Sequence, residues 1–201
     1  TINKKISSDS ILKFSAEKLL IYGLNPLLNA INNKKRIIHH IVIAKNISQH
    51  HLDQILESSA SRIAKNPDLI IRVDEDKILE LIEDFRQQNK GLNKSKAVKN
   101  TSKNYLQNIV HQGVLAICDY QKFGNQFDLL SKLHLLKKDL IEDSNSNLPT
   151  LLLLDQITDP QNFGAIIRSA IAFGVDNIII PEHHSVKETS AVIKASAGDI
   201  E

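Results

Sequence analysis

Blocks of branched aliphatic residues alternate with segments whose apolar residues recur every three or four positions. Short apolar runs of this kind predict strands, whereas the longer spacing predicts amphipathic helices. In the first part of the chain, strands are expected at 37–44, 69–73 and 113–118. Helices are expected between them, one following Ser48 as its N-cap and one opening at Asp74. This order predicts a small α/β domain that ends near Tyr120.

The pattern restarts after residue 149. The run TLLLL at 150–154 is nearly all apolar, as expected of a strand that is covered on both faces. The helical pattern FGAIIRSAIAF follows, with an apolar stripe on one side and Gly174 as its C-cap, and NIIIP at 177–181 predicts a second strand. Residues 150–201 are therefore expected to contain a βαβ unit. The stripe consists of Phe163, Ile166, Ile167, Ala170 and Ile171.

The remaining segments complete the predicted organisation. Residues 1–17 are expected to form a loose leader, and 121–149 a linker that contains some helix. An early helix is expected with Asn25 as N-cap and Pro26 in its first turn. A two-stranded parallel unit is too small to be stable alone, because parallel sheets need several strands covered by helices. Either the first domain or a partner covers its open edge, or the natural product continues past Glu201.

Composition places the chain among ordinary globular proteins. It has 201 residues, 42% of them hydrophobic and 24% charged. It has neither an apolar run of the roughly 20 residues that a membrane helix needs nor a secretory signal, so a cytoplasmic protein without membrane contact is expected. The single Cys118 excludes an internal disulfide and is expected to be buried.

The net charge is only +2, but basic residues concentrate between Arg86 and His111, a stretch without any acid. This stretch is rich in Asn and Ser, which favours a mobile loop. It is either a solvated surface loop or an arm that follows RNA phosphates, with binding that weakens as salt rises. The residues proposed to contact RNA are Lys94, Lys96, Lys99 and Lys103.

The segment DPQNFGAIIR places chemistry at the start of a helix. Asp159 suits the N-cap and Pro160 the first helical position, and a helix N-terminus beyond a strand favours anions such as phosphate. Arg168 lies off the apolar stripe and is expected over Gly164, where the missing side chain leaves room, with its guanidinium near Asn162. The alternative is a surface arginine that extends along its own helix.

The string NFGAIIR, within LDQITDPQNFGAIIRSAIAFGVDNIIIP, resembles the first conserved motif of the SpoU (TrmH-like) family of RNA ribose 2'-O-methyltransferases in the knotted SPOUT superfamily. LIYGLNPLLNAI at 20–31 and NIVHQGVLAI at 108–117 resemble the beginning and end of that family's RNA-binding domain, whose fold is like that of certain ribosomal proteins. The similarity extends over residues 18–201. It is closest to the branch that methylates a guanosine of large-subunit ribosomal RNA.

This resemblance implies an RNA methyltransferase that uses S-adenosylmethionine, with Arg168 and Asn162 in the catalytic centre. A guanidinium hardly ever loses its proton, so Arg168 is expected to bind the phosphate beside the target ribose and stabilise the forming alkoxide, with Asn162 holding the hydroxyl. The family's second and third motifs, which supply most of the cofactor pocket, are absent. The trefoil knot and the usual homodimer are therefore expected to be incomplete, as in a split, decayed or fragmentary gene product.

The sequence gives less support for other kinds of site. The His-His pairs at 39–40, 50–51 and 183–184 suggest a metal site, but neighbours on a strand point to opposite faces, and no metal is expected. His111 is expected to have a structural role in a turn or a domain contact, and the alternative is a catalytic base. No glycine-rich dinucleotide motif or P-loop occurs.

The expected fold is thus α/β, with an RNA-binding α/β/α domain at 18–120 and the first part of a SPOUT methyltransferase domain at 150–201. Three functions are open. The chain is a methyltransferase that acts only within a longer or complemented polypeptide, an RNA-binding remnant without activity, or a structural protein whose open βαβ edge is covered by a partner.

Overall fold

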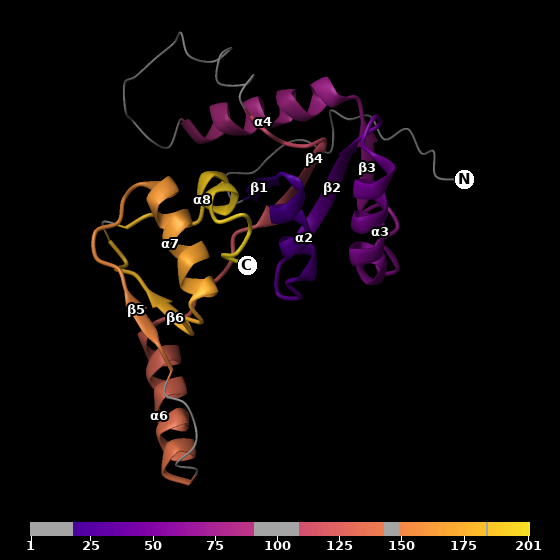
Figure 1. Ribbon diagram of the computed structural model, residues 1–201. Helices are drawn as coiled ribbons and strands as arrows, with labels where there is room; N and C mark the ends of the chain where they lie inside the picture. Colours follow the sequence, from indigo (N-terminus) through magenta and orange to yellow (C-terminus); the bar gives the residue numbers. More distant parts are fainter. Residues whose placement is uncertain (1–17, 91–108, 143–148, 184) are drawn as a thin grey trace. The chain divides into compact units, whose positions relative to one another are not determined.

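A computed structural model describes residues 18–90, 109–142, 149–183 and 185–201 (Figure 1). The chain divides into two compact units: unit 1 contains residues 1–120 and Glu201, and unit 2 contains residues 121–200. Four proposed RNA contacts lie outside the described residues: Lys94, Lys96, Lys99 and Lys103. Within the described ranges, every helix is too short or too polar to traverse a bilayer.

Unit 1 is built on a four-stranded mixed sheet. Across the sheet the order is β1 (Lys18–Tyr22), β4 (Val114–Asp119), β2 (Ile38–Ala44) and β3 (Ile70–Val73). The strand β4 runs antiparallel to both of its neighbours, and β3 runs parallel to β2. The three predicted strands are confirmed to within one or two residues. The first strand was not expected from the sequence, although KLLIY is apolar enough to have predicted it.

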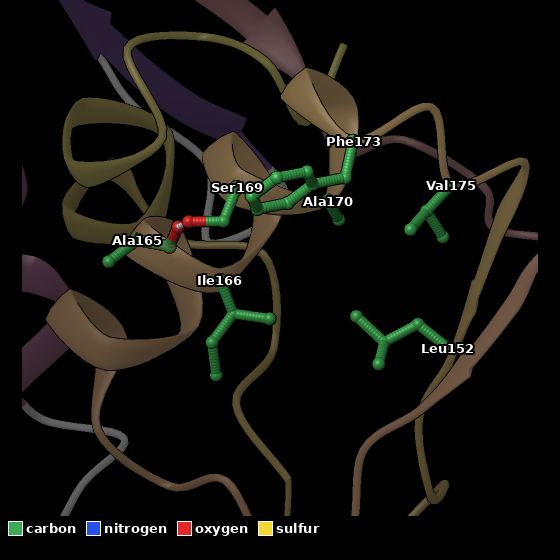
Figure 2. A pocket seen from close by; sticks show the side chains of 7 residues that line it. All are labelled: Leu152, Ala165, Ile166, Ser169, Ala170, Phe173 and Val175. Carbon is green, nitrogen blue, oxygen red and sulfur yellow. Dashed lines mark hydrogen bonds between the residues drawn. The ribbon is translucent and has the colours of Figure 1, made fainter.

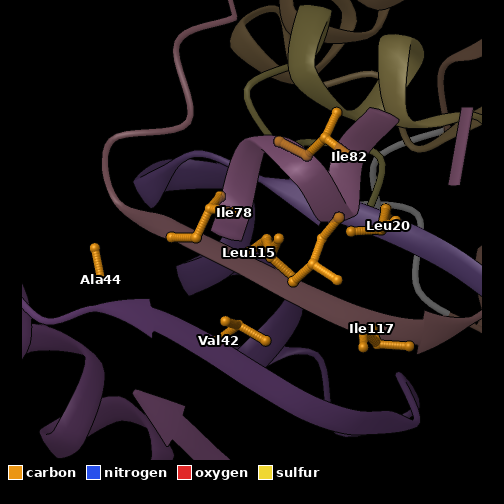
Figure 3. Packing of buried hydrophobic residues seen from close by; sticks show 8 residues of the cluster. Leu20, Val42, Ala44, Ile78, Ile82, Leu115 and Ile117 are labelled. Atoms are coloured by element: carbon orange, nitrogen blue, oxygen red, sulfur yellow. The ribbon is translucent and has the colours of Figure 1, made fainter. Parts of the chain in front are cut away.

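Three helices cover this sheet: α2 (Leu24–Asn32), α3 (Gln49–Ile63) and α4 (Glu75–Lys90). Figure 3 shows alternate residues of β1, β2 and β4 packed with Ile78 and Ile82 of α4, so this helix covers one face. On α3, Ser48 is the predicted N-cap and accepts the N–H of His51. The stretch from Arg86 to Lys90 is helical and not a loop. Here Gln87 donates to Glu83 one turn earlier, at 3.1 Å, which extends the helix into the basic stretch.

The start of α2 differs from the prediction. Its N-cap is Gly23, with φ 96°, and not Asn25. The N–H of Leu24 is bound instead by the side-chain oxygen of Gln112, at 3.0 Å, from the turn that precedes β4. Because this acceptor comes from a residue remote in sequence, the local signal of Asn25 did not reveal the true helix boundary.

A cluster of three charged or titratable side chains joins three strands of unit 1. The pairing of β2 with β4 shifts register between Ile38 and His40, which leaves His39 as an extra residue. The Nε2 atom of His39 lies 2.8 Å from an oxygen of Asp119, and Nζ of Lys18 lies 2.5 Å from the same oxygen. The hydrogen bond from Lys18 is the main reason that the pKa of Asp119 lies below its ordinary value.

Unit 2 contains α6 (Gln126–Glu142), β5 (Leu151–Leu153), α7 (Pro160–Ala172), β6 (Asn177–Ile179) and α8 (Ser190–Ala195). The strands β5 and β6 are parallel and α7 connects them, which confirms the predicted βαβ unit. The C-cap of α7 is Phe173, one residue before the predicted Gly174, which follows in the turn at φ 69°. The short helix α8 was not expected.

The two strands of unit 2 are not covered on both faces by the residues that the structure describes. Leu152 packs toward the core of unit 2, which includes Phe163 and Ile167 of α7. Its neighbours Leu151 and Leu153 point to the opposite face and are 39% and 70% exposed. The prediction of a strand buried on both faces is therefore wrong for this chain, because no described element packs on that face. The predicted stripe of α7 is also too wide, since Ile171 is 51% exposed.

Candidate functional site

The beginning of α7 follows the local sequence signals. Asp159 is the N-cap and Pro160 is the first helical residue. One carboxylate oxygen of Asp159 accepts the N–H groups of Gln161 and Asn162, at 2.6 and 3.0 Å. Proline suits this position because its fixed φ matches the helix and it has no N–H that needs a partner.

These contacts leave the first turn of α7 without an amide for an external anion. Pro160 carries no N–H, Gln161 and Asn162 donate to the Asp159 side chain, and Phe163 donates to the Asp159 carbonyl at 3.0 Å. The negative charge of Asp159 also occupies the position that a phosphate would take. The predicted anion site at this helix N-terminus is therefore not available. A phosphate near α7 would have to be bound by side chains.

Exposed polar side chains of α7 could do so: Gln161 and the two predicted site residues, Asn162 and Arg168. Arg168 and Asn162 are both exposed, and among the described residues no side chain or backbone group bonds the guanidinium of Arg168 or the amide of Asn162. They are six residues apart, which in an α-helix means about 9 Å along the axis and about 120° around it. The long arginine side chain leans toward the helix N-terminus, which shortens this separation. Both groups face solvent, where they could contact a ligand.

The role expected for Gly164 is wrong. It does not leave a space for Arg168, because the backbone of α8 fills the position that a side chain would occupy. A Cβ atom at 164 would overlap the Cβ of Ala195 and lie 2.8 Å from the backbone nitrogen of Ser196. The glycine therefore permits close packing of two helices.

A shallow groove of about 360 Å³ runs beside α7 (Figure 2). Its lining is almost entirely apolar and consists of Leu152, Ala165, Ile166, Ser169, Ala170, Phe173 and Val175. The hydroxyl of Ser169 donates to the carbonyl of Ala165 at 3.1 Å and is thus engaged within the helix. Phe173, at 86% exposed, forms one edge. This groove was not expected from the sequence, although the small residues Ala165, Ser169 and Ala170 on one helix face could have indicated it.

The histidine pairs were considered as a possible metal site. No group of three or more His, Cys, Asp or Glu side chains within the described ranges could hold a metal ion. His111 is buried, and its Nδ1 accepts the N–H of Gly113 at 3.0 Å, which agrees with the structural role expected in this turn. Cys118 is buried in β4, as expected.

Residues 149–201 match the model of the SpoU rRNA Methylase family. This part of the chain is similar to that family. The SpoU segment, as we call residues 149–201, contains β5, α7, β6 and α8, and thus includes both Asn162 and Arg168.

The chain also has TrmH-family homologues. A protein of Staphylococcus aureus (strain COL) described as a TrmH family tRNA/rRNA methyltransferase is 41% identical over 97 residues, which is 48% of this chain and 36% of that protein. A Staphylococcus epidermidis protein with the same description is 28% identical over 185 residues, 92% of this chain and 59% of that protein. The chain thus spans less than two thirds of the length of either relative.

Solved structures share the fold. An AdoMet-bound rRNA methyltransferase from Sinorhizobium meliloti aligns with a TM-score of 0.51 and 19% identity, covering 92% of this chain and 51% of that one. The SpoU methyltransferase AviRb from Streptomyces viridochromogenes, in complex with AdoMet, aligns with a TM-score of 0.53 and 14% identity, covering 96% and 56%. At these identities, the comparison supports an α/β fold of the SpoU methyltransferase type.

Proposed function

We propose that this chain is part of an RNA ribose 2'-O-methyltransferase that modifies large-subunit ribosomal RNA with S-adenosylmethionine as methyl donor. The observation that carries the proposal is the solvent-facing guanidinium of Arg168, which has no partner among the described residues and lies within the SpoU segment. The names of the homologues and the AdoMet-bound structural neighbours support the same reaction class.

In this proposal Arg168 binds the phosphate next to the target ribose and stabilises negative charge that develops on the 2'-oxygen. The closed N-terminus of α7 supports this role, because it leaves side chains as the means of binding a phosphate there. The amide of Asn162 holds the hydroxyl or a neighbouring group by a hydrogen bond. Arg168 is not assigned as the base, since a guanidinium keeps its proton in proteins.

The groove beside α7 does not fit S-adenosylmethionine by itself. Its carboxylate, sulfonium and adenine need polar partners, whereas the groove beside α7 is apolar and its one hydroxyl, on Ser169, already donates within the helix. We therefore propose that the chain alone is catalytically incomplete and that other polypeptide supplies the cofactor pocket and the homodimer contact. Exposed Leu153 and Phe173 support such a covering element.

Calorimetric titration of the chain with S-adenosylmethionine, alone and with a ribosomal RNA fragment, tests this proposal. We expect RNA to bind and the cofactor not to bind until the remaining methyltransferase sequence of a longer relative is added. Cofactor binding at micromolar strength by the chain alone would contradict catalytic incompleteness. Absence of methyl transfer after complementation, with RNA still bound, would favour the second function, an RNA-binding remnant. A stable protein complex that resists nuclease and has no RNA affinity would favour a structural role.

A further inference from the structure

The contact between α7 and α8 is made by backbone at the position of Gly164. A Cβ atom there would overlap the Cβ of Ala195 and lie 2.8 Å from both the carbonyl carbon of Ala195 and the nitrogen of Ser196. Real Cβ atoms essentially never approach other heavy atoms within 3.0 Å. Two of these three neighbours are backbone atoms, which cannot turn aside. Any side chain at 164 must therefore displace one helix from the other.

The α8 segment is held too firmly to give way easily. Thr189 caps its beginning, since its hydroxyl accepts the N–H of Val192 at 3.2 Å. Its end is closed by two backbone bonds, from Gly198 to the carbonyl of Ile193 at 2.8 Å and from Ala197 to that of Lys194 at 3.1 Å. The side chains of Val192, Ile193 and Ser196 are almost completely buried. A larger residue at 164 would consequently move α7 and the groups that α7 carries.

Arg168 is one helical turn beyond Gly164. Residues i and i+4 lie about 40° apart around a helix, so the exposed Arg168 leaves α7 beside the face that packs on α8. Among the described residues no hydrogen bond or ion pair fixes the guanidinium. The position of the α7 backbone therefore determines where this group can reach.

We propose that Gly164 is a positioning residue, which sets the location of Arg168 and Asn162 by allowing α7 to pack directly on the backbone of α8. It touches no reacting group and acts only through the helix. Its importance for methyl transfer rests on the function proposed above, but the geometric claim can be tested without turnover.

The experiment follows the Nε–Hε resonance of Arg168 and the side-chain amide of Asn162 by NMR in the full 201-residue chain. We expect Gly164→Ala to shift both resonances. Ala195→Gly in the same chain should restore them in part, because it removes the Cβ overlap but leaves the two backbone contacts. Val186→Ala, a buried change outside both helices, controls for loss of stability, and Ala165→Ser controls for a substitution on the exposed side of α7.

Three outcomes would overturn the proposal: no shift with Gly164→Ala, shifts of equal size in the controls, or no restoration by Ala195→Gly. If Gly164→Ala does not fold, the double variant Gly164→Ala/Ala195→Gly decides, because it keeps the two backbone contacts that should still displace α7, and unchanged resonances of Arg168 and Asn162 would contradict the claim. Failure of the proposed function is a separate result. It would appear as methyl transfer that is indifferent to Arg168 while the NMR response to Gly164→Ala remains.

Discussion

The carboxylate of Asp159 accepts the backbone N–H of Asn162 at 3.0 Å, and its geometry closes the N-terminus of α7. The same oxygen accepts the N–H of Gln161, so the residue that starts the helix also removes its amides as an anion site. A helix N-terminus can be capped by a side chain or can bind an external anion with its free amides, and Asp159 leaves only the first role at α7. It stabilises the helix, and it leaves anion binding to the side chains of α7.

Replacing Asp159 by alanine should lower the free energy of unfolding of unit 2 by about 1 kcal/mol, because two N–H groups lose their acceptor. Asp159→Asn should retain most of the stability, since an asparagine oxygen can accept the same bonds. Chemical denaturation checks both values. Asp155→Ala is the matched control, because Asp155 is exposed and lies before the cap. An equal loss in the control would argue against the capping role.

Arg168→Ala in a complete, complemented enzyme should abolish measurable turnover and leave RNA affinity within a few fold. The reason is that a donor aimed at developing negative charge acts mainly in the transition state and typically contributes about 10²–10³ in rate. Arg168→Lys should recover only part of the activity, since an ammonium cannot reproduce the planar fork. Lys187→Ala, another exposed cation of the SpoU segment, is the control. Weakened RNA binding with normal turnover at saturation would refute the assigned role.

The pair formed by Lys18 and Asp119 should make the stability of unit 1 depend on acid. The pKa of Asp119 is lowered in the folded state, first by the hydrogen bond from Lys18, so the stabilisation is complete above the unfolded pKa of about 3.9 and is lost as pH falls through the folded value. In Lys18→Met, the free energy of unfolding of unit 1 should decrease less as the pH falls from about 5 to about 2, as measured by chemical denaturation at each pH. Lys45→Met, which removes an exposed ion pair with Asp74, is the control. The same pH dependence of the free energy of unfolding in both variants would contradict the prediction.

Ala197→Gly should stabilise unit 2. Ala197 has φ 55° at the end of α8, a left-handed conformation that costs an alanine about 1–2 kcal/mol and a glycine little. The greater freedom of glycine in the unfolded chain offsets part of this, so a net gain of about 0.5–1 kcal/mol is expected in thermal or chemical denaturation. Ala165→Gly makes the same substitution in a helix interior and should lower stability by about 1 kcal/mol. A loss at both positions would show that the strain at 197 is not relieved.

The sequence by itself determined the features that depend on neighbouring residues. Ser48 and Asp159 were correctly predicted as N-caps, and the predicted C-cap Gly174 lies one residue beyond the observed one, because a cap bonds within a few residues of itself and its signal is local. The βαβ order of unit 2 followed from the same local periodicity. The motif also predicts Asn162 and Arg168 as site residues, since both are read from one continuous segment.

Only the tertiary structure decided the features that depend on remote residues. Gln112 moved the start of α2 to Leu24, across a separation of 88 residues. The antiparallel pairing of β1 with β4 brought Lys18 and Asp119 together from opposite ends of unit 1, and the register shift in β2 left His39 beside them. Gly164 appeared to offer room for a side chain until α8 was found to occupy that space. Which residues pack against a glycine depends on the tertiary structure. The sequence around Gly164 therefore did not show that α8 lies against it.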